Sequence, residues 1–438
     1  MIRRPLAASL LASAGLAAPA LAQDDTPHAG MLRHPDVSAS EIVFVYANDL
    51  WIVSRDGGQA RPLASPAGQE MFPKFSPDGS RVVFQGNYDG DRDLYSMPTT
   101  GGLPNRLTHR PGPEMPTDWT ADDQIAFFTF ADRDGITSPR MYSVPPDGGL
   151  PGKMPIEYGA NGVVSDDGRW LAYTPFWRDS RTWKRYKGGM AADVWLFNLE
   201  TNESRQITDW DGTDTLPMWH GDTVYYLSDA GPEHRLNVWA YDTETERRRQ
   251  ITEFTEFDVK FPSIGPGPEG QGEIVFQLGD ELRLVDLSTG QSRVINVTVP
   301  GARPALRPQA VEAGQNMAGG GISSTGKRAV VEARGDIWTV PADNGPIRQI
   351  TDTSGAAERS PAWSPDGRWI AYFSDEDGEY ELYLTQSDGK GETRQLTDGN
   401  ETFFFSSTWS PDSESILVTD KAGRMLLVDV ETGDMTEI

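Results

Sequence analysis

The sequence predicts an all-β fold: a six-bladed β-propeller followed by the first three blades of a second β-propeller. A triplet of an acidic or amide residue, an apolar residue and an aromatic residue, such as Asp93-Leu94-Tyr95, recurs along the chain. Counting three weaker copies, it occurs nine times at steps of 43 to 55 residues. Short β-type segments separated by tight turns surround each copy, and a repeat of about 40–50 residues with short strands is typical of propeller blades. The longest step follows the sixth copy and contains a stretch rich in Pro and Gly.

The segment Met71–Thr108 shows the predicted elements of one blade. Its four strands are expected at Phe72–Phe75, Arg81–Gln85, Asp93–Met97 and Asn105–Thr108. The first turn is Ser76-Pro77-Asp78-Gly79, in which Pro presets one turn position and Gly accepts a positive φ. No segment of the chain shows a sustained 3.6-residue period, so almost no helix is expected. The aromatic residue of each triplet is predicted to be a core residue rather than part of a ligand site.

Two arrangements fit nine blades: one nine-bladed ring, or a closed ring of six followed by part of a second ring. Propellers typically have four to eight blades, and the segment Val299–Pro308 has the composition of a linker. The second arrangement is therefore favoured. It places the six-bladed propeller at residues 31–299, the linker at 300–315 and a partial second propeller of three blades at 316–438. Three blades alone would leave apolar faces and strand edges exposed.

The first 22 residues are predicted to be a signal peptide. Arg3 and Arg4 precede the apolar run Leu6–Ala20, and Ala20-Leu21-Ala22 has the small-x-small pattern of a cleavage site. The mature protein is then expected in the periplasm after cleavage behind Ala22. The alternative, an uncleaved membrane anchor, is disfavoured because the run is short and rich in Ala.

Composition excludes several classes of function. The chain has no Cys, which excludes disulfides, thiolate metal sites and Cys nucleophiles. Its formal net charge of −26 is spread along the sequence and argues against a nucleic-acid partner, which needs a basic face. No segment after the predicted signal peptide approaches the apolar length of a membrane span, so no membrane partner is predicted.

The sequence shows no pattern typical of a catalytic or metal site. Two of the five histidines, His28 and His34, are placed before the first blade, and none of the five forms a metal-binding pattern. A Gly-x-Ser-x-Gly elbow is absent, and the acidic loop Asn87–Asp93 lacks the spacing of an EF-hand, so it is predicted to be a turn. No catalytic residue, metal or cofactor is therefore predicted. A hydrolase site built from scattered His and Asp at the centre of a ring is left as an alternative.

A basic, aromatic insertion in the fourth blade departs most from the repeat. It spans residues 175–192, between two predicted strands. Arginine pairs with carboxylates and aromatic rings supply contact area, as on peptide-binding surfaces. The candidate substrate-binding residues are Arg178, Arg181, Trp183, Lys184, Arg185 and Tyr186. The alternative is a loop that packs on a neighbouring domain, with its basic groups paired to local Asp residues.

Several longer strings are not generic to propellers. They are Arg181–Gly189 ahead of Asp193-Val194-Trp195, Thr208–Asp214, Pro217–Asp222, Phe257–Gly267 and Glu332–Asp336. With these strings in order from about residue 31 to the end, the chain resembles the N-terminal half of a bacterial tricorn-type serine protease. The resemblance implies a six-bladed propeller, then a seven-bladed one, then a PDZ-like module and a serine-protease core. Only the first ring and three blades of the second are expected in this sequence, so no catalytic residue is carried over.

The resemblance implies a noncatalytic, substrate-gating and peptide-handling part of an exported tricorn-like serine protease. Its implied partners are peptides or unfolded polypeptide and a downstream protease core, and homo-oligomerisation is left open. The family is also thought to hold peptide C-termini with arginines of a first-propeller loop. The third-blade loop here has only Arg133 and Arg140 and no Arg-Arg pair, so that role is not transferred. The alternative function is a TolB-like periplasmic propeller that acts as a protein-interaction module.

Overall fold

The described part of the chain is all-β, as predicted. The computed structural model describes residues 30–64, 68–131, 138–180, 186–301, 312–353, 355–391, 393–400 and 402–438. These residues form nine four-stranded antiparallel sheets, one two-stranded parallel pair and the 3-10 turn η2 (Ala313–Asn316). Within the same ranges, no helix has the length and apolar character needed to cross a membrane.

The first six sheets each pair four strands in chain order. The first two sheets contain β1 (Arg33–Val37), β2 (Glu41–Tyr46), β3 (Asp49–Ser54), β5 (Arg61–Ala64), and β6 (Glu70–Phe75), β7 (Arg81–Gly86), β8 (Asp93–Pro98), β9 (Asn105–Arg106). The next two contain β10 (Glu114–Trp119), β11 (Ile125–Thr129), β12 (Arg140–Val144), β13 (Gly152–Lys153), and β14 (Ala160–Val164), β15 (Trp170–Thr174), β16 (Trp195–Asn198), β17 (Ser204–Gln206). The last two contain β18 (Asp214–His220), β19 (Thr223–Ser228), β20 (Asn237–Asp242), β21 (Arg248–Gln250), and β22 (Val259–Gly265), β23 (Glu273–Leu278), β24 (Glu281–Asp286), β25 (Ser292–Ile295).

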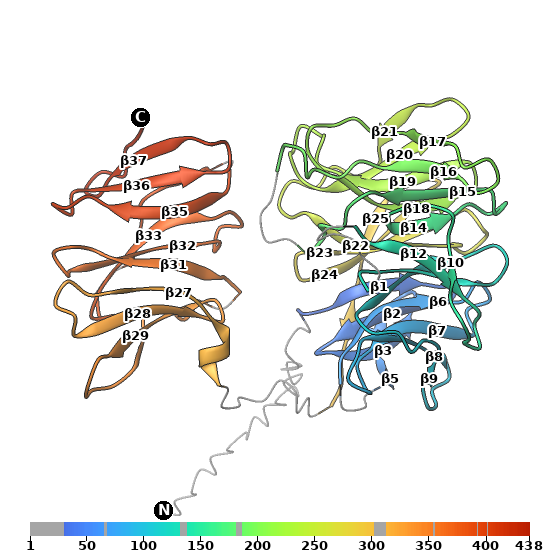
Figure 1. Cartoon of the computed structure of the whole chain (residues 1–438), viewed down its shortest axis with the longest axis horizontal. Coiled ribbons are helices and arrows are strands. Elements are labelled where there is room, and N and C mark those ends of the chain that lie inside the picture. The colour runs from blue at the N-terminus through green and yellow to red at the C-terminus, as the bar shows by residue number, and fades with distance from the viewer. Residues whose placement is uncertain are drawn as a thin grey trace, which may run out of the picture.

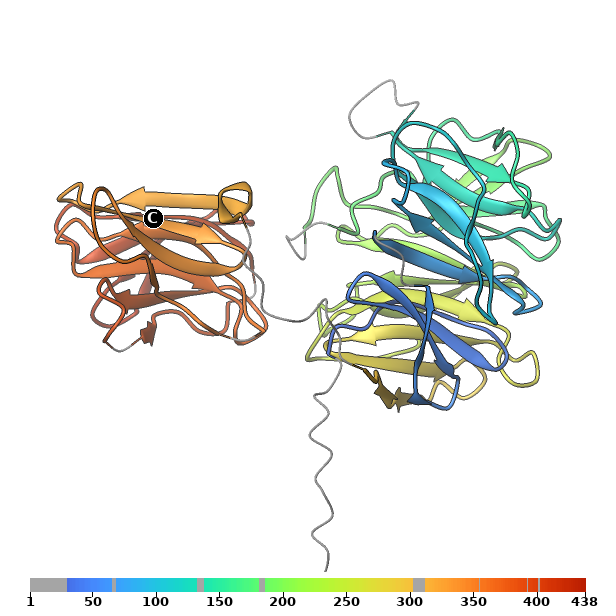
Figure 2. The ribbon, with the colours of Figure 1, turned by 90° about the horizontal axis from the view of Figure 1, so that it is seen from below.

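Three further sheets follow in the C-terminal part and have the same strand order. Their strands are β27 (Met317–Ile322), β28 (Arg328–Ala333), β29 (Asp336–Pro341), β30 (Arg348–Gln349), then β31 (Glu358–Trp363), β32 (Trp369–Ser374), β33 (Glu381–Gln386), β34 (Thr393–Gln395), and finally β35 (Phe404–Trp409), β36 (Ser415–Asp420), β37 (Met425–Asp429), β38 (Met435–Glu437). Figures 1 and 2 show the first six sheets as one body and these three as a second, smaller body. We call them the six-sheet ring and the three-sheet body.

The first strands of the six-sheet ring form a closed circle. In chain order β1, β6, β10, β14, β18 and β22 each pack against the next, and β22 packs against β1. Every seam between neighbouring sheets, including the seam between the last sheet and the first, contains its own cluster of buried apolar side chains. The largest fully buried residues, such as Phe84, Phe127 and Phe276, lie in second strands, which are covered on both faces.

The repeating triplet has a structural explanation at these seams. Its apolar residue is fully buried in the stronger copies, at Leu50, Leu94, Val194, Val238, Ile337 and Leu382. Its aromatic residue packs with the clusters, as Tyr95 and Tyr142 do at 3% and 5% exposure. The backbone N–H of Leu94 donates to the hydroxyl of Thr108 at 2.9 Å. The equivalent bond recurs at Thr208, Thr252, Thr351 and Thr397. The core role predicted for the aromatic residues is confirmed at Tyr95, Tyr142 and Tyr383, whereas Trp51, Trp195 and Trp239 are half-buried and pack against the edges of clusters.

The seam between the sixth sheet and the first has additional links. The short strand β26 (Val297–Thr298) pairs in parallel with β4 (Gly58–Gln59) of the first sheet. Gly57 beside it has φ +89, and a Cβ there would lie 2.6 Å from the carbonyl oxygen of Asn296. The guanidinium of Arg55 donates two hydrogen bonds, each of 2.5 Å, to the carboxylate of Glu273 across the seam. The chain thus joins its first and last sheets by backbone pairing and by a bidentate ion pair.

The seams also contain carboxyl groups whose burial alters their pKa. Burial raises the pKa of Glu70, Glu114 and Asp214 to about 7 each, whereas carboxyls in an unfolded chain titrate at about pH 4. The folded chain therefore binds these protons more tightly than the unfolded chain. Their contribution to stability is complete below the unfolded pKa and is lost as the pH rises through about 7.

We expect the melting temperature to rise by about 5 °C when the pH is lowered from 8 to 6.5. One buried group opposes this trend, because burial lowers the pKa of His34 to about 3. That histidine reduces stability only as the pH falls below its unfolded pKa of about 6.5. Circular-dichroism melts at constant ionic strength provide the measurement, and Glu114→Gln should reduce the rise. A melting temperature that is constant or falls over this interval would contradict the expectation.

Candidate functional site: the axis cavity

A cavity of about 750 Å³ lies where the first strands of the six-sheet ring meet, and we call it the axis cavity. All six first strands contribute to its wall, together with residues that follow β7, β11 and β15. Its volume is within the range of about 300–1,000 Å³ usual for ligand pockets. It is therefore the candidate functional site of the described residues.

The backbone of the first strands explains why their side chains project into this cavity. Five of the six first strands contain an X-Pro pair, and β10, with Met115-Pro116, is the one in which the residue before Pro has no positive φ. The other four pairs are His34-Pro35, Phe72-Pro73, Leu216-Pro217 and Phe261-Pro262. In these four pairs the residue before Pro has a φ of 48° to 53°, and the pairing register shifts there. Such bulges re-aim side chains, and Pro is tolerated because the first strand is a sheet edge that needs no donor on its free side.

His34 is part of an aromatic layer in the cavity wall. Its ring centroid lies 4.4 Å from that of Phe72 and 4.0 Å from that of Phe261. Burial lowers the pKa of His34 to about 3, with the nearby charges of Arg33 and Lys74 acting in the same direction. The imidazole is therefore neutral at physiological pH. The expectation that His34 precedes the first blade is wrong: it lies in β1, because the first strand begins at Arg33.

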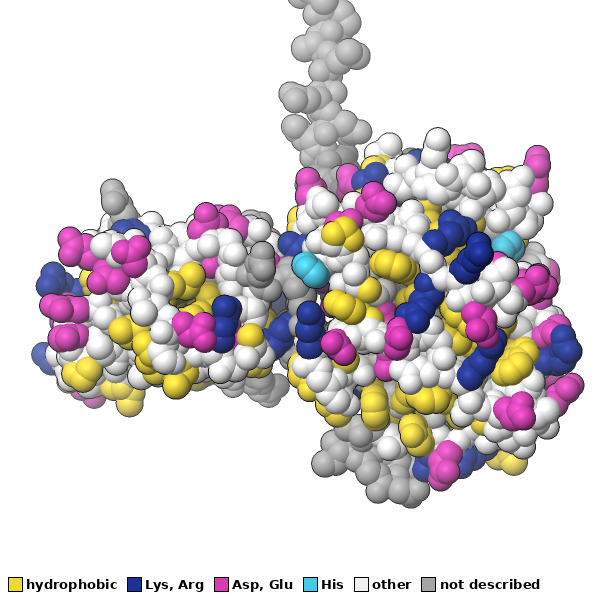
Figure 3. All heavy atoms as spheres, turned by 90° about the horizontal axis from the view of Figure 1, so that it is seen from above, with side chains coloured by type: hydrophobic (Ala, Val, Ile, Leu, Met, Phe, Trp, Pro, Cys, Tyr) yellow, Lys and Arg dark blue, Asp and Glu magenta, His cyan; other side chains and the backbone are white. Residues whose placement is uncertain are grey.

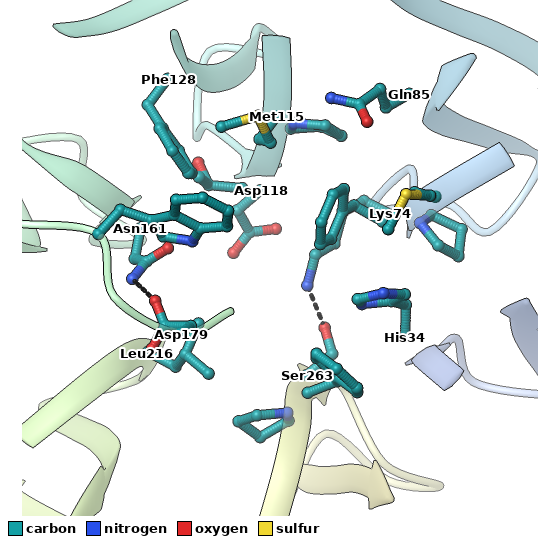
Figure 4. Close-up of a pocket in the computed structure, with 18 of the residues that line it drawn as sticks. His34, Lys74, Gln85, Met115, Asp118, Phe128, Asn161, Asp179, Leu216 and Ser263 are labelled. Atoms are coloured by element: carbon teal, nitrogen blue, oxygen red, sulfur yellow. Dashed lines mark hydrogen bonds between the residues drawn. The ribbon is translucent and has the colours of Figure 1, made fainter. Parts of the chain in front are cut away.

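A polar network crosses the cavity wall and joins three sheets. Figure 4 shows the Lys74 ammonium reaching Ser263, and this N–O distance is 2.5 Å. The same ammonium lies 3.8 Å from the carboxylate of Asp36. Asp36 accepts hydrogen bonds from the Ser263 hydroxyl and from the Phe75 N–H. Burial raises the pKa of Asp36, and the charge of Lys74 opposes that rise. The network thus satisfies its own charges within the wall.

Asp118 of β10 is a carboxylate of the cavity wall. One of its oxygens accepts the N–H of the next residue, Trp119, at 2.8 Å, and in Figure 4 its carboxyl group points into the open centre. The register shift between Pro116 and Asp118 places this side chain on the wall. Burial raises the pKa of Asp118 to about 6, against the opposing charge of Lys74. The group is therefore ionised at neutral pH and above.

The wall on the side of the third and fourth sheets is aromatic. The ring of Trp177 lies 5.9 Å from that of Phe128 and 5.8 Å from that of Phe130. The segment that carries Trp177 is held by Asp179, which accepts hydrogen bonds from Asn161 at 2.8 Å and Thr215 at 2.7 Å. The carboxylate of Asp179 thus anchors the start of the basic insertion to the fourth and fifth sheets.

Charged groups of both signs line the axis cavity. Arg33, Arg92 and Lys260 contribute to its wall in addition to Lys74. Figure 3 shows one face of the molecule, on which Lys and Arg side chains are interspersed with hydrophobic side chains over the six-sheet ring. This distribution contrasts with the formal net charge of −26 of the whole chain. Within the described residues there is no group of three or more His, Asp or Glu side chains suited to hold a metal ion.

The residues predicted from the basic insertion are only partly described. Arg178 is half-buried, donates to the carbonyl oxygen of Trp177 at 3.0 Å and is not part of the cavity wall. Tyr186 is half-buried. Arg181, Trp183, Lys184 and Arg185 lie outside the described residues. The neighbouring Trp177, Asp179 and Ser180 do line the cavity. The sequence feature that could have indicated the cavity wall is the X-Pro pair, which recurs in the first strand of successive sheets.

Four-stranded antiparallel sheets whose first strands surround a central cavity define a β-propeller. The chain belongs to the tricorn protease N-terminal β-propeller family, because the family described as "Tricorn protease N-terminal beta propeller domain" matches residues 29–291. The resemblance inferred from the sequence strings is thereby confirmed.

Individual relatives agree with this family. The chain is 28% identical to tricorn protease homolog 1 of Streptomyces coelicolor over 415 residues, which cover 93% of the chain and 38% of that relative. It is 24% identical to the tricorn protease homolog of Saccharolobus solfataricus over 405 residues, which cover 91% of the chain and 36% of that relative. The crystal structure of the tricorn protease matches with a TM-score of 0.55 at 18% identity, over 93% of this chain and 39% of that one. This structural match supports the fold alone. The chain spans little more than a third of the length of these relatives.

Proposed function

We propose that the chain is the noncatalytic, peptide-handling part of an exported tricorn-like serine protease, and that peptides or unfolded polypeptide bind in the axis cavity. The observation that carries this proposal is the cavity itself, in which aromatic and apolar side chains alternate with a few charged groups. Pockets of this character orient a ligand through polar groups and gain affinity from apolar contacts. A protease core supplied by a longer tricorn-like protein would then perform the chemistry.

The proposed domain arrangement follows the sheets. The six-sheet ring is assigned as one six-bladed propeller over residues 31–299, with a linker at 300–315. The three-sheet body is assigned as the first three blades of a second propeller of the seven-bladed type, over residues 316–438. Its sheets pack in chain order, β27 against β31 and β31 against β35, in the manner of the six-sheet ring.

Limited proteolysis tests the assignment, since cleavage within 300–315 should release two protease-resistant bodies. Cleavage first inside the six-sheet ring would refute it.

The proposed location is the periplasm, supported by Arg3, Arg4 and the small residues that end at Ala22. N-terminal sequencing of the exported protein should begin at Gln23. A mature chain that retains Met1 would refute this part of the proposal.

Peptide binding by the axis cavity can be measured by fluorescence anisotropy with a short labelled peptide of Gly, Ser, Leu and norleucine. We expect Phe130→Ala to weaken binding by about fivefold or more, because the ring belongs to the aromatic wall. Phe405→Ala is the matched control, since Phe405 is 53% exposed and lies in the three-sheet body. Equal affinity of the wild-type chain and Phe130→Ala would contradict a binding role for this wall.

The basic insertion keeps its proposed role in binding. Arg181→Ala, Lys184→Ala and Arg185→Ala combined, in a full-length parent, should slow peptide processing if these side chains contact the substrate. Unchanged processing together with reduced thermal stability would favour the alternative, in which the loop only packs against the protein.

A further inference from the structure

We propose that Asp118 makes the axis cavity selective for a positively charged group of the bound polypeptide, namely the side chain of Lys or Arg. This inference rests on the proposed function, because it requires that the cavity bind polypeptide. It adds a preference that follows from charges and hydrogen bonds in the wall rather than from its aromatic groups.

Two other carboxylates, Asp179 in the wall and Asp36 behind it, already have partners on both oxygens. Asp36 accepts from Ser263 and lies near the Lys74 ammonium through one oxygen, and accepts from the Phe75 N–H through the other. Asp179 accepts from Thr215 through one oxygen and from Asn161 through the other. Neither group needs a ligand to complete its hydrogen bonding.

Asp118 is the carboxylate whose bonding is incomplete. Among the described residues its side chain has one hydrogen bond, from the N–H of Trp119 to one oxygen. The second oxygen has no such partner, and the carboxyl group ends in the open centre of the cavity (Figure 4). A half-buried carboxylate gains most from a donor that is itself charged, because charge-assisted hydrogen bonds are the stronger ones.

Lys74 does not supply that donor. Its ammonium is held by Ser263 at 2.5 Å and lies 3.8 Å from Asp36, and no ion pair within 4.0 Å joins it to Asp118 in the described part of the chain. The charges of Lys74 and Asp36 largely offset each other. Lys74 therefore acts on Asp118 through space and not as a hydrogen-bond donor. Arg33, Arg92 and Lys260 also line the cavity, but none of them forms an ion pair with Asp118 among the described residues. The second oxygen of Asp118 is thus still open to a cationic donor, and the group is ionised near neutral pH since its pKa is about 6.

The surroundings of Asp118 suit a long basic side chain. Met115 and Phe128 lie beside it in Figure 4, and both are buried wall residues. The aliphatic part of Lys or Arg packs well on apolar surface while its charged end reaches a polar partner. A small cation without such a stem would lack these contacts, so the wall favours a side chain of a polypeptide over a free ion.

The test compares two peptides on the wild-type chain by fluorescence anisotropy. Both are acetylated, amidated and labelled, and they differ only in a central Lys or norleucine, which removes the charge and keeps the stem. We expect the Lys peptide to bind about tenfold more tightly at pH 7.5. If neither peptide binds, the proposed function fails. If both bind equally, or the norleucine peptide binds better, the preference for cations fails while the proposed function stands.

Two variants assign the preference to its residue. With Asp118→Asn, the Lys peptide and the norleucine peptide should bind with equal affinity, whereas with Asp123→Asn the Lys peptide should still bind about tenfold more tightly. Asp123 is an exposed residue in the turn after β10, so the control makes the same change of net charge outside the cavity.

A third peptide with norleucine and a free N-terminal amine distinguishes an ammonium at the chain end from a Lys side chain. Persistence of the difference between the Lys and norleucine peptides in folded Asp118→Asn would overturn the assignment.

Discussion

Replacing Glu273 with Gln is expected to destabilise the six-sheet ring by about 3–5 kcal/mol. Glu273 is 1% exposed and Arg55 is 19% exposed, and the bidentate pair joins the sixth sheet to the first. Gln cannot accept both hydrogen bonds of the guanidinium, so a charge is left without its counter-ion in a mostly buried place. The hydrogen bonding of the pair also raises the pKa of Arg55, so deprotonation offers no relief.

The measurement is urea unfolding followed by circular dichroism. Glu246→Gln is the control, because the Arg205–Glu246 pair is 39% and 66% exposed and such surface pairs contribute about 0–1 kcal/mol. The double variant Arg55→Met with Glu273→Leu should regain much of the lost stability, since replacing both members of a buried pair with apolar groups is often neutral. A Glu273→Gln loss no larger than that of the control would show that β26–β4 pairing and the apolar cluster are sufficient to close the ring.

The repeating scaffold could be predicted because its signals are local. Each triplet combines a buried apolar residue such as Leu94 with an aromatic residue such as Tyr95, and each turn has its own Pro or Gly. These residues act within one sheet or at the next seam. Because these residues repeat at a nearly regular period, the individual sheets can be predicted from the sequence without knowing how the sheets assemble into a ring.

The axis cavity could not be predicted in the same way, because it forms only when sheets far apart in sequence meet. Asp36 and Ser263 are hydrogen-bonded although 227 positions separate them in the sequence. Close to them, the rings of His34 and Phe261 are in contact. Nothing next to His34 in the sequence indicates such a partner. The X-Pro pairs did mark the wall, since Pro within a strand indicates a sheet edge. The basic insertion was predicted to bind substrate from its composition. Among its described residues, however, Trp177, Asp179 and Ser180 line the cavity and Arg178 does not.

Replacing Lys74 with Met is expected to destabilise the chain by about 3 kcal/mol at pH 8. Lys74 is the cation of the network that joins the first, second and sixth sheets, and its loss leaves the buried Asp36 carboxylate with hydrogen bonds but without a counter-charge. Combining Lys74→Met with Asp36→Asn should recover most of the stability, because the amide is neutral. The coupling between the two positions follows from a double-mutant cycle of unfolding free energies.

A pH series separates this electrostatic effect from a simple loss of packing. Burial already raises the pKa of Asp36, and Lys74 is the main group that opposes the rise, so removing Lys74 should raise the pKa further. A carboxyl whose folded pKa is raised stabilises the chain at low pH and loses that contribution as the pH rises through the folded pKa. The deficit of Lys74→Met relative to wild type should therefore be largest at pH 8 and shrink toward pH 5. A deficit that is independent of pH would instead mean that Lys74 acts through its methylene contacts, and that Asp36 is kept ionised by Ser263 and the Phe75 N–H alone.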